Sequence, residues 1–360
     1  MIIINLATID FGGGGGSSKP LITEPLIANI WSRGRKVFTP ANYNVDGFSD
    51  VTINTAVIGD NSALDFSIIG WDDTDSNNVN SIYNADITHS EEVLDKWNNE
   101  QISNFNGDTK LVYCPLIDTS NVTNLYNFFN GCNNLQFIPQ LNTSNATNMS
   151  GMFGGCESLR TIPMFDTSKI INMTQVFLGC TSLISIPQLD TSKVTKMTQT
   201  FYSCSSLESI PAINTENVTE MNNMFSNCSS LTTIPLLNTS NVTNMWQTFY
   251  GCSSLQSLPL LNFQSVNNIN TFFGYITMSN LTDLGGFKDL KIDWNDTTGL
   301  AKCPNLTYQS VMNVLNNLYD FRVNGDDTTT RTIKLNSNSY NLLTADDIAM
   351  ANAKGWNVTK

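Results

Sequence analysis

Six cysteines recur at a constant 24-residue interval, and this regularity constrains the fold more than any other feature of the chain. A fixed period of roughly 20–50 residues is typical of a solenoid, in which each repeat packs mainly against its neighbours. The period therefore predicts a stack of 24-residue units. The repeating cysteines are Cys132, Cys156, Cys180, Cys204, Cys228 and Cys252.

Other residue types keep the same interval and define the repeat unit. The unit reads Cys-x-x-Leu-x-x-Ile-Pro-x-Leu-Asp/Asn-Thr-Ser-x-Val-Thr-x-Met-x-x-x-Phe. In one copy, Ile170, Met173 and Phe177 fall at i, i+3 and i+7, which predicts a short helix. Leu183 to Ile186 then predicts a short strand that Pro187 ends, because proline has no N–H for a ladder. Stacked copies would pair these strands in a parallel ladder about 4.8 Å apart. The phenylalanine column is Phe129, Phe153, Phe177, Phe201, Phe225, Phe249 and Phe273.

The cysteine column has three interpretations. Small buried thiols, one per coil, are the favoured one, because Cys114 takes the place of a column isoleucine. Disulfides between neighbouring coils are the second, although side chains in register point parallel and not at each other. Metal binding is the third, and the sequence has neither a Cys-x-x-Cys motif nor a histidine column for it.

The repeats carry a recognisable motif, seen in Met152-Phe153-Gly154-Gly155-Cys156 and in Met224-Phe225-Ser226-Asn227-Cys228. With Leu-Asp-Thr-Ser-x-Val-Thr-x-Met, they resemble the BspA-type leucine-rich repeat over nearly half of the chain. The resemblance implies a leucine-rich-repeat solenoid. Members of that family are adhesins and host-contact proteins of bacteria and some protists, and the repeat also occurs in phage tail proteins. The segment Tyr43 to Ile53 is similar to a short segment frequent in phage tail and baseplate proteins.

The array divides the chain, and we expect an α/β fold in which a solenoid with a parallel strand ladder joins two smaller parts. The β-rich domain is predicted from alternating stretches such as Val51 to Asn54, and a helix over Glu91 to Asn98 leads into the first coil. In the α+β cap we expect a helix over Leu306 to Leu318, a strand over Thr328 to Leu335 and a second helix from Thr344. The predicted domains are 1–18, a strand and a glycine-rich flexible connector; 19–108, a β-rich docking domain; 109–275, the repeats; and 276–360, the C-terminal cap.

Composition excludes two classes of partner. The chain is acidic, with a net charge of −13, so phosphate backbones and anionic lipid surfaces do not attract it. It has no run of about 18 apolar residues, which predicts no membrane insertion. The apolar start at Met1 to Leu6 lacks a basic flank, so we expect no secretory signal.

Residues suited to catalysis are scarce, and we expect no enzyme, no catalytic residue and no cofactor. The one histidine, His89, lies where a helix begins. Asp72 to Asn77 is similar to the start of a calcium loop, but Asn78 replaces the glycine that such a loop needs, so no metal site is predicted. The Asp/Asn column exchanges acid for amide freely, which suits a turn and not a general base.

A binding or structural role remains, and two hypotheses compete. The first is a virion structural protein, a phage tail or tail-fibre component that docks on other tail, baseplate or fibre proteins through its N-terminal region. Its repeats would bind a glycan or protein of the host surface. The alternative is a bacterial cell-surface adhesin of the same repeat family. Homo-oligomerisation stays open in both. The variable positions that we expect to face the ligand are Arg160, Met164, Ile184, Gln188, Glu208, Ala212, Thr232, Leu236, Gln256 and Leu260.

Overall fold

The computed structural model describes residues 4–5, 56–58, 62–64 and 92–360, apart from residues 113, 115, 116, 137, 296 and 326–329. Three short strands, β1 (Ile4–Asn5), β2 (Ala56–Ile58) and β3 (Ser62–Leu64), pair antiparallel in the order β1-β2-β3. The predictions for the glycine-rich connector, the tail-like segment, Asp72 to Asn77 and His89 lie outside the described residues. The expected helix before the array is present over residues 92–98.

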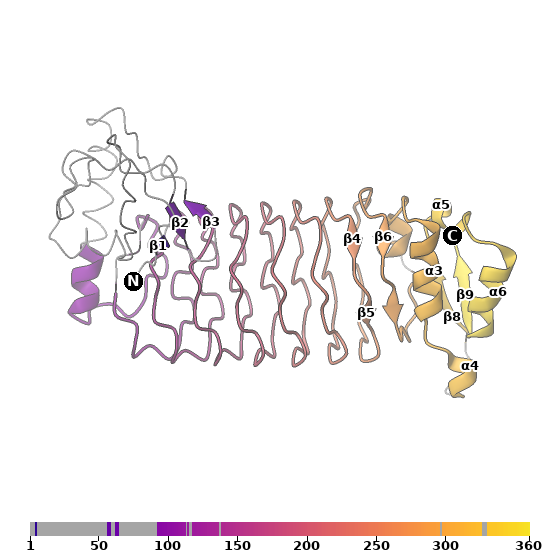
Figure 1. The fold of residues 1–360 in the computed structure, drawn as a ribbon, viewed down its shortest axis with the longest axis horizontal. Coiled ribbons are helices and arrows are strands. Elements are labelled where there is room, and N and C mark those ends of the chain that lie inside the picture. Colours follow the sequence, from indigo (N-terminus) through magenta and orange to yellow (C-terminus); the bar gives the residue numbers. More distant parts are fainter. Residues whose placement is uncertain are drawn as a thin grey trace, which may run out of the picture.

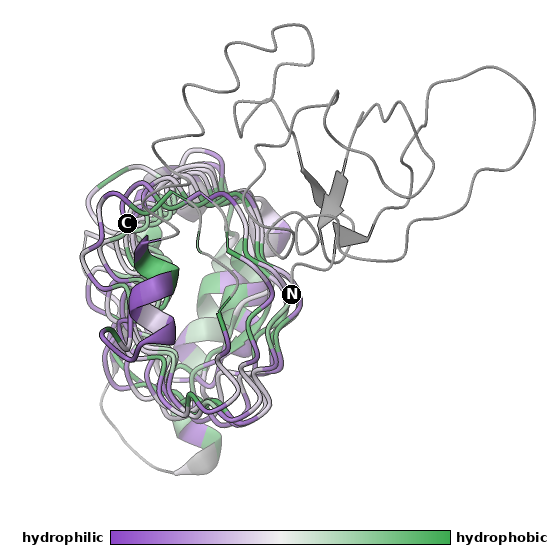
Figure 2. Ribbon diagram, turned by 90° about the vertical axis from the view of Figure 1, so that its left-hand side faces the viewer, coloured by the Kyte–Doolittle hydropathy of each residue, from purple (hydrophilic) through white to green (hydrophobic). Residues whose placement is uncertain are grey.

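The repeats stack as coils in one register. Parallel bridges join each coil to the next at the residue before the methionine column, from Asn124–Asn148 to Asn244–Asn268. Each of these bridges joins equivalent positions of neighbouring repeats, so the structural offset equals the sequence period. The coils consequently lie side by side along the molecule (Figure 1) and superimpose when viewed along the stack (Figure 2).

The stack is longer than the sequence period indicates at both ends. Phe105 lies one period before Phe129 and stacks on its ring, with centroids 5.2 Å apart. After residue 275 another coil follows. Its strands β6 (Asp283–Leu284) and β7 (Phe287–Lys288) pair in parallel with β4 (Ser257–Leu258) and β5 (Leu261–Asn262) of the coil before it. The partners in this coil, such as Ser257 and Asp283, are further apart in the sequence than one period, so a strict 24-residue pattern misses it.

The short helix predicted over Ile170 to Phe177 is wrong. The N–H groups of Met173, Gln175 and Phe177 donate to carbonyl oxygens of the next coil, at N···O distances of 2.9–3.0 Å. The N–H group of Val176 donates only three residues back, to Met173. Gln175 has a φ of 60°, which an α-helix does not contain. The burial prediction is nevertheless confirmed, because Ile170, Met173 and Phe177 are all buried.

The predicted parallel ladder exists in a reduced form. At the predicted strand, one backbone hydrogen bond joins most of the regular coils to the one before, for example from Ile184 N–H to Arg160 O at 3.0 Å. Within the described part of the repeats, only the last regular coil is extended enough to hold strands, namely β4 and β5. Pro259 follows β4 directly, where its missing N–H breaks no ladder.

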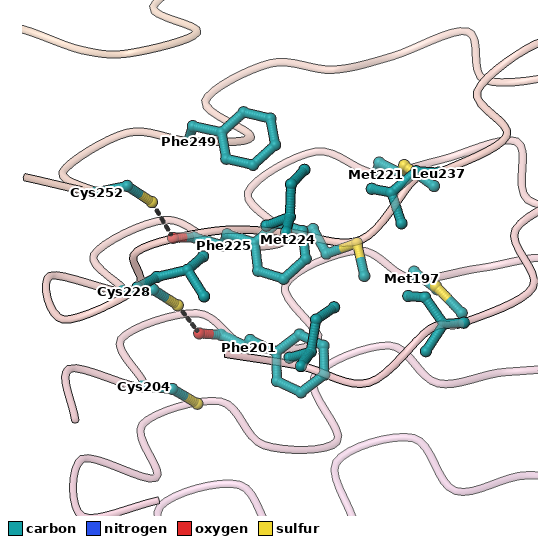
Figure 3. Packing of buried hydrophobic residues seen from close by; sticks show 14 of the residues in the cluster. Met197, Phe201, Cys204, Met221, Met224, Phe225, Cys228, Leu237, Phe249 and Cys252 are labelled. Atoms are coloured by element: carbon teal, nitrogen blue, oxygen red, sulfur yellow. Dashed lines mark hydrogen bonds between the residues drawn. The ribbon is translucent and has the colours of Figure 1, made fainter. Parts of the chain in front are cut away.

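Columns of identical side chains fill the interior (Figure 3). Neighbouring rings of the phenylalanine column stack with centroids 5.5–5.7 Å apart from Phe129 to Phe249. Beside them, each column cysteine donates its thiol hydrogen to the carbonyl of a phenylalanine in the previous coil, as Cys228 does to Phe201 at 3.0 Å. No single repeat could bury these residues, so the core exists only in the stack.

An α+β segment follows the array. The helix predicted over Leu306 to Leu318 is confirmed as α3 (Tyr308–Asn317), with Thr307 as its N-cap. The second predicted helix is confirmed as α6 (Ala345–Ala353), and Thr344 forms a capping box at its start. The predicted strand is confirmed as β8, and its parallel partner β9 was not predicted. None of the helices among the described residues has the length and hydropathy of a membrane-spanning segment. The elements are η2 (Leu300–Lys302), α3 (Tyr308–Asn317), α4 (Phe321–Asn324), β8 (Arg331–Lys334), α5 (Ser337–Tyr340), α6 (Ala345–Ala353) and β9 (Trp356–Thr359).

Helix α3 covers the open end of the stack. Ser310 Oγ accepts from Leu284 N–H at 3.0 Å and donates to Thr282 O at 2.9 Å. Asn313 Nδ2 donates to Leu284 O at 2.8 Å. These side chains satisfy the backbone groups that a further coil would otherwise pair, which is how a cap ends a repeat stack.

Candidate ligand-binding surface

Five of the ten predicted ligand-facing residues lie in one line across successive coils. Backbone hydrogen bonds connect these five residues. From the second residue of the line onward, each N–H donates to the carbonyl oxygen of the predicted residue in the previous coil, at N···O distances of 2.9–3.2 Å. The side chains of this line therefore follow one another at the spacing of the coils. Three are exposed and two half-buried. In order, the residues of the line are Arg160, Ile184, Glu208, Thr232 and Gln256.

The other five predicted residues form a ridge, four positions further along each coil. Leu236 is the most exposed, at 71%, and Met164 and Leu260 follow at 43% and 37%. Gln188 and Ala212 are also exposed, and Gln188 Nε2 donates to Ala212 O at 2.5 Å. The structure thus places the ten residues in two lines along the stack, four positions apart in each coil, and we call these two lines together the ridge surface. It is apolar in some coils and polar in others.

Two shallow grooves run along the ridge surface. One, of about 470 Å³, is lined by Met164 and Gln188 together with Asp166 and Asp190. The other, of about 430 Å³, is lined by Leu236 and Leu260, with Asn214, Asn238 and Asn262. Each groove combines ridge side chains with oxygen acceptors of the Asp/Asn column. Such a surface can hold an apolar group and the polar groups beside it.

The Asp/Asn column is committed to turns. Asp166 Oδ1 accepts from the Ser168 N–H at 3.0 Å and from its hydroxyl at 2.7 Å. These hydrogen bonds from Ser168 lower the pKa of the Asp166 carboxyl. Asn214 Oδ1 accepts from the Glu216 N–H at 2.9 Å in the same arrangement. Acid and amide therefore do the same work, which is to close an Asx turn.

The cysteine prediction is confirmed: all eight cysteines are free and buried. Desolvation by burial raises the pKa of every thiol, and that of Cys132 rises to about 12. Since the thiolate is the nucleophile and the metal ligand, these groups are poor candidates for either role. Among the described residues, no group of three or more His, Cys, Asp or Glu side chains is placed to hold a metal ion.

Sequence reasoning missed the exposed aromatic residues. Tyr126 is 56% exposed, Trp246 40% and Tyr275 65%. The sequence did carry a signal for the first two, since the four coils between them hold small or polar residues at the same repeat position. A large aromatic at such a position has no place in the interior. Those intervening residues are Ser150, Thr174, Thr198 and Asn222.

Two overlapping matches to one family model cover residues 114–208 and 184–284. The model is described as "Mycoplasma protein of unknown function, DUF285". Together the matches span slightly less than half of the chain, and they coincide with the repeats. No curated protein matches the chain.

Solved structures also show similarity. A leucine-rich repeat protein of T. pallidum (TpLRR) is 19% identical, with 45% of this chain and 61% of that protein covered and a TM-score of 0.27. A leucine-rich repeat protein from Bacteroides ovatus is 12% identical, with 72% and 87% covered and a TM-score of 0.18. A TLR13–ssRNA13 complex is 14% identical, with 70% and 42% covered and a TM-score of 0.27. The match thus spans less than two thirds of the T. pallidum protein.

The two proteins from T. pallidum and Bacteroides ovatus are leucine-rich repeat proteins, the class that the resemblance of the repeats implied. The repeat stack itself is seen in the register of this chain's own coils, which bridge at equivalent positions. Residues 114–284 are similar to the family described as DUF285.

Proposed function

We propose that the chain is a non-enzymatic binding protein, a BspA-type leucine-rich-repeat solenoid that presents its ridge surface to a ligand on a cell surface. One observation carries the proposal: most of the residues that vary between repeats are exposed, in two lines along the stack, whereas the cysteine, phenylalanine and methionine columns are buried. In repeat proteins the buried residues build the stack and the exposed ones contact the partner. The shielded thiols and the turn-bound Asp/Asn column favour binding over catalysis.

Two placements of this binding protein are compatible with the repeats. The segment at residues 43–53 is similar to phage tail and baseplate proteins, which favours a tail or tail-fibre component that carries the ridge surface to a host receptor. The repeat family itself favours an adhesin on a bacterial surface. In both cases the ridge surface binds and the N-terminal region attaches the protein to its support.

The binding proposal is tested with fluorescently labelled full-length chain on a panel of intact bacterial and host cells. Replacing Leu236 and Leu260 by serine removes the two exposed apolar side chains that line one groove of the ridge surface together. We expect at least tenfold weaker binding to whichever cell binds the wild type. The matched control is Ile171→Ser, since Ile171 is 50% exposed and belongs to neither line of the ridge surface. Equal binding by all three proteins would contradict the proposal.

The placement is tested by mass spectrometry of fractions from the source culture. A tail component co-purifies with intact phage particles, whereas an adhesin appears in the bacterial envelope fraction. Detection only in the soluble cell fraction, with no particle or envelope signal, would contradict both placements.

A further inference from the structure

A larger groove lies at the N-terminal end of the stack, apart from the ridge surface. It is an open groove lined by side chains from residues 97–104 and 118–128, and its volume is about 740 Å³. It shares none of the ten ridge residues. Small-molecule sites have volumes of roughly 300–1,000 Å³, so the groove is large enough for a ligand of several rings.

Three aromatic side chains line the groove, namely Trp97, Tyr126 and Phe128, and the ring of Trp97 is held by its neighbours. The ring of Trp97 stacks on Phe105, with centroids 5.8 Å apart and planes 8° apart. It also meets the edge of Phe128, at 5.6 Å. Tyr126 is 56% exposed, whereas Ser150, at the same position of the next coil, is buried. The groove therefore offers aromatic surface at a position where another coil hides its side chain.

The remaining lining is rich in neutral hydrogen-bonding groups. Asn98, Asn104, Asn121 and Asn124 contribute exposed amides, each with donors and an acceptor. The amide oxygens of Asn104 and Asn124 accept from backbone N–H groups two residues on, at 3.1 Å, which orients both side chains.

Two acids complete the lining, and none of its described residues is basic. Glu100 and Asp118 are both exposed and can accept hydrogen bonds from hydroxyl groups. Glu100 also has a φ of 57°, at the end of the helix of residues 92–98, where glycine is the usual residue.

We infer that this groove binds a neutral oligosaccharide. A sugar ring presents an apolar face of C–H groups that packs on an aromatic ring. Its hydroxyl groups both donate and accept, and so match amides and carboxylates. The acidic lining opposes phosphorylated, sulfated and sialylated ligands by like-charge repulsion. The inference goes beyond the proposed function, because it assigns a second site and a ligand class.

The test is an array of immobilised uncharged trisaccharides (maltotriose, cellotriose, mannotriose and triacetylchitotriose) and anionic sialyllactose, probed with the full-length chain. We expect binding to at least one neutral sugar and none to sialyllactose. Calorimetry with the best sugar then compares Tyr126→Ala with Tyr275→Ala. Both tyrosines are largely exposed, but only Tyr126 lines the groove. Tyr126→Ala should bind at least tenfold more weakly, and Tyr275→Ala within twofold of the wild type.

Three outcomes would overturn the inference: no neutral sugar binds, sialyllactose binds best, or Tyr126→Ala retains wild-type affinity. Thermal unfolding of both variants shows whether a loss of affinity is local. The Leu236→Ser/Leu260→Ser variant should keep its sugar affinity, so failure at the groove and failure at the ridge surface are distinguishable.

Discussion

At the residue scale, the stack depends on hydroxyl groups that connect neighbouring coils. The buried Thr239 donates from Oγ1 to Asn262 O at 2.8 Å and accepts from Asn262 N–H at 2.7 Å. Thr167 occupies the same column and is equally buried, but its hydroxyl has no hydrogen-bond partner among the described residues. Two threonines of the same column therefore differ in one respect: the hydroxyl of Thr239 is hydrogen-bonded, and that of Thr167 is not.

The pair leads to a prediction for valine, which has nearly the shape of threonine. Thr239→Val leaves a buried N–H and a carbonyl without their partner, so it should lower the free energy of unfolding by about 1–3 kcal/mol. Thr167→Val removes only an unsatisfied hydroxyl and should be neutral or stabilising. Urea unfolding at pH 7 measures both. An equal loss in the two variants would contradict the assigned hydrogen bonds.

The buried thiols predict a dependence of stability on pH. Burial raises the pKa of Cys132 from its ordinary value of 9.0 to about 12. An acid with a raised folded-state pKa stabilises the fold below the unfolded pKa, and this contribution is lost as the pH rises from 9 to 12. The slope is about 1.4 kcal/mol per pH unit for one thiol.

Cys132→Ser tests this directly, because serine does not titrate and can still donate to Phe105 O, as the Cys132 thiol does at 3.0 Å. Between pH 9.5 and 11, its free energy of unfolding should fall less steeply than that of the wild type, by about 1.4 kcal/mol per pH unit. Urea unfolding at three pH values measures the slopes. Parallel curves would show that the thiol is not shielded in the folded state.

At the scale of elements, local sequence patterns predicted the helices of the C-terminal segment correctly. They did not predict the backbone structure of the repeats, which depends on contacts between coils. The helix over Leu306 to Leu318 and the helix from Thr344 were predicted from local patterns, and α3 and α6 form there. In the repeats, Ile170, Met173 and Phe177 have the spacing of a helix face, and all three are buried. The turn that forms instead buries the same residues. What separates the two structures is the backbone partners in the next coil, and no local pattern contains them.

The candidate site was likewise predictable only where the sequence pattern itself places the residues. That the ten variable residues would form two lines along the stack could be predicted, because the period alone places equivalent positions in line. The groove lined by Trp97 and Tyr126 could not, since it joins a helix outside the repeats to the first coil. Neither residue belongs to a column, and their proximity arises only from the packing of Trp97 on Phe105 and Phe128.

At the scale of the whole molecule, one register organises everything else. It aligns the phenylalanine rings, the thiols and the ridge surface, and it ends where α3 pairs the last coil. The length of the array was underestimated for a physical reason: the coil after residue 275 has partners further apart in the sequence than one period, as in Ser257 and Asp283. The backbone there still pairs in parallel with the coil before it, although the sequence period is broken.

The central claim is that residues one period apart occupy adjacent coils of one stack. Double electron–electron resonance between spin labels on Arg160→Cys and Gln256→Cys tests it most directly, because these residues lie four coils apart on one line. The native thiols are buried, so unmodified protein should take up little label. With about 4.8 Å between coils, the backbones are about 19 Å apart, and a single narrow distribution near that distance is predicted. A broad distribution would contradict the stack. So would a distribution whose centre differs from about 19 Å by more than the length of the two spin-label side chains.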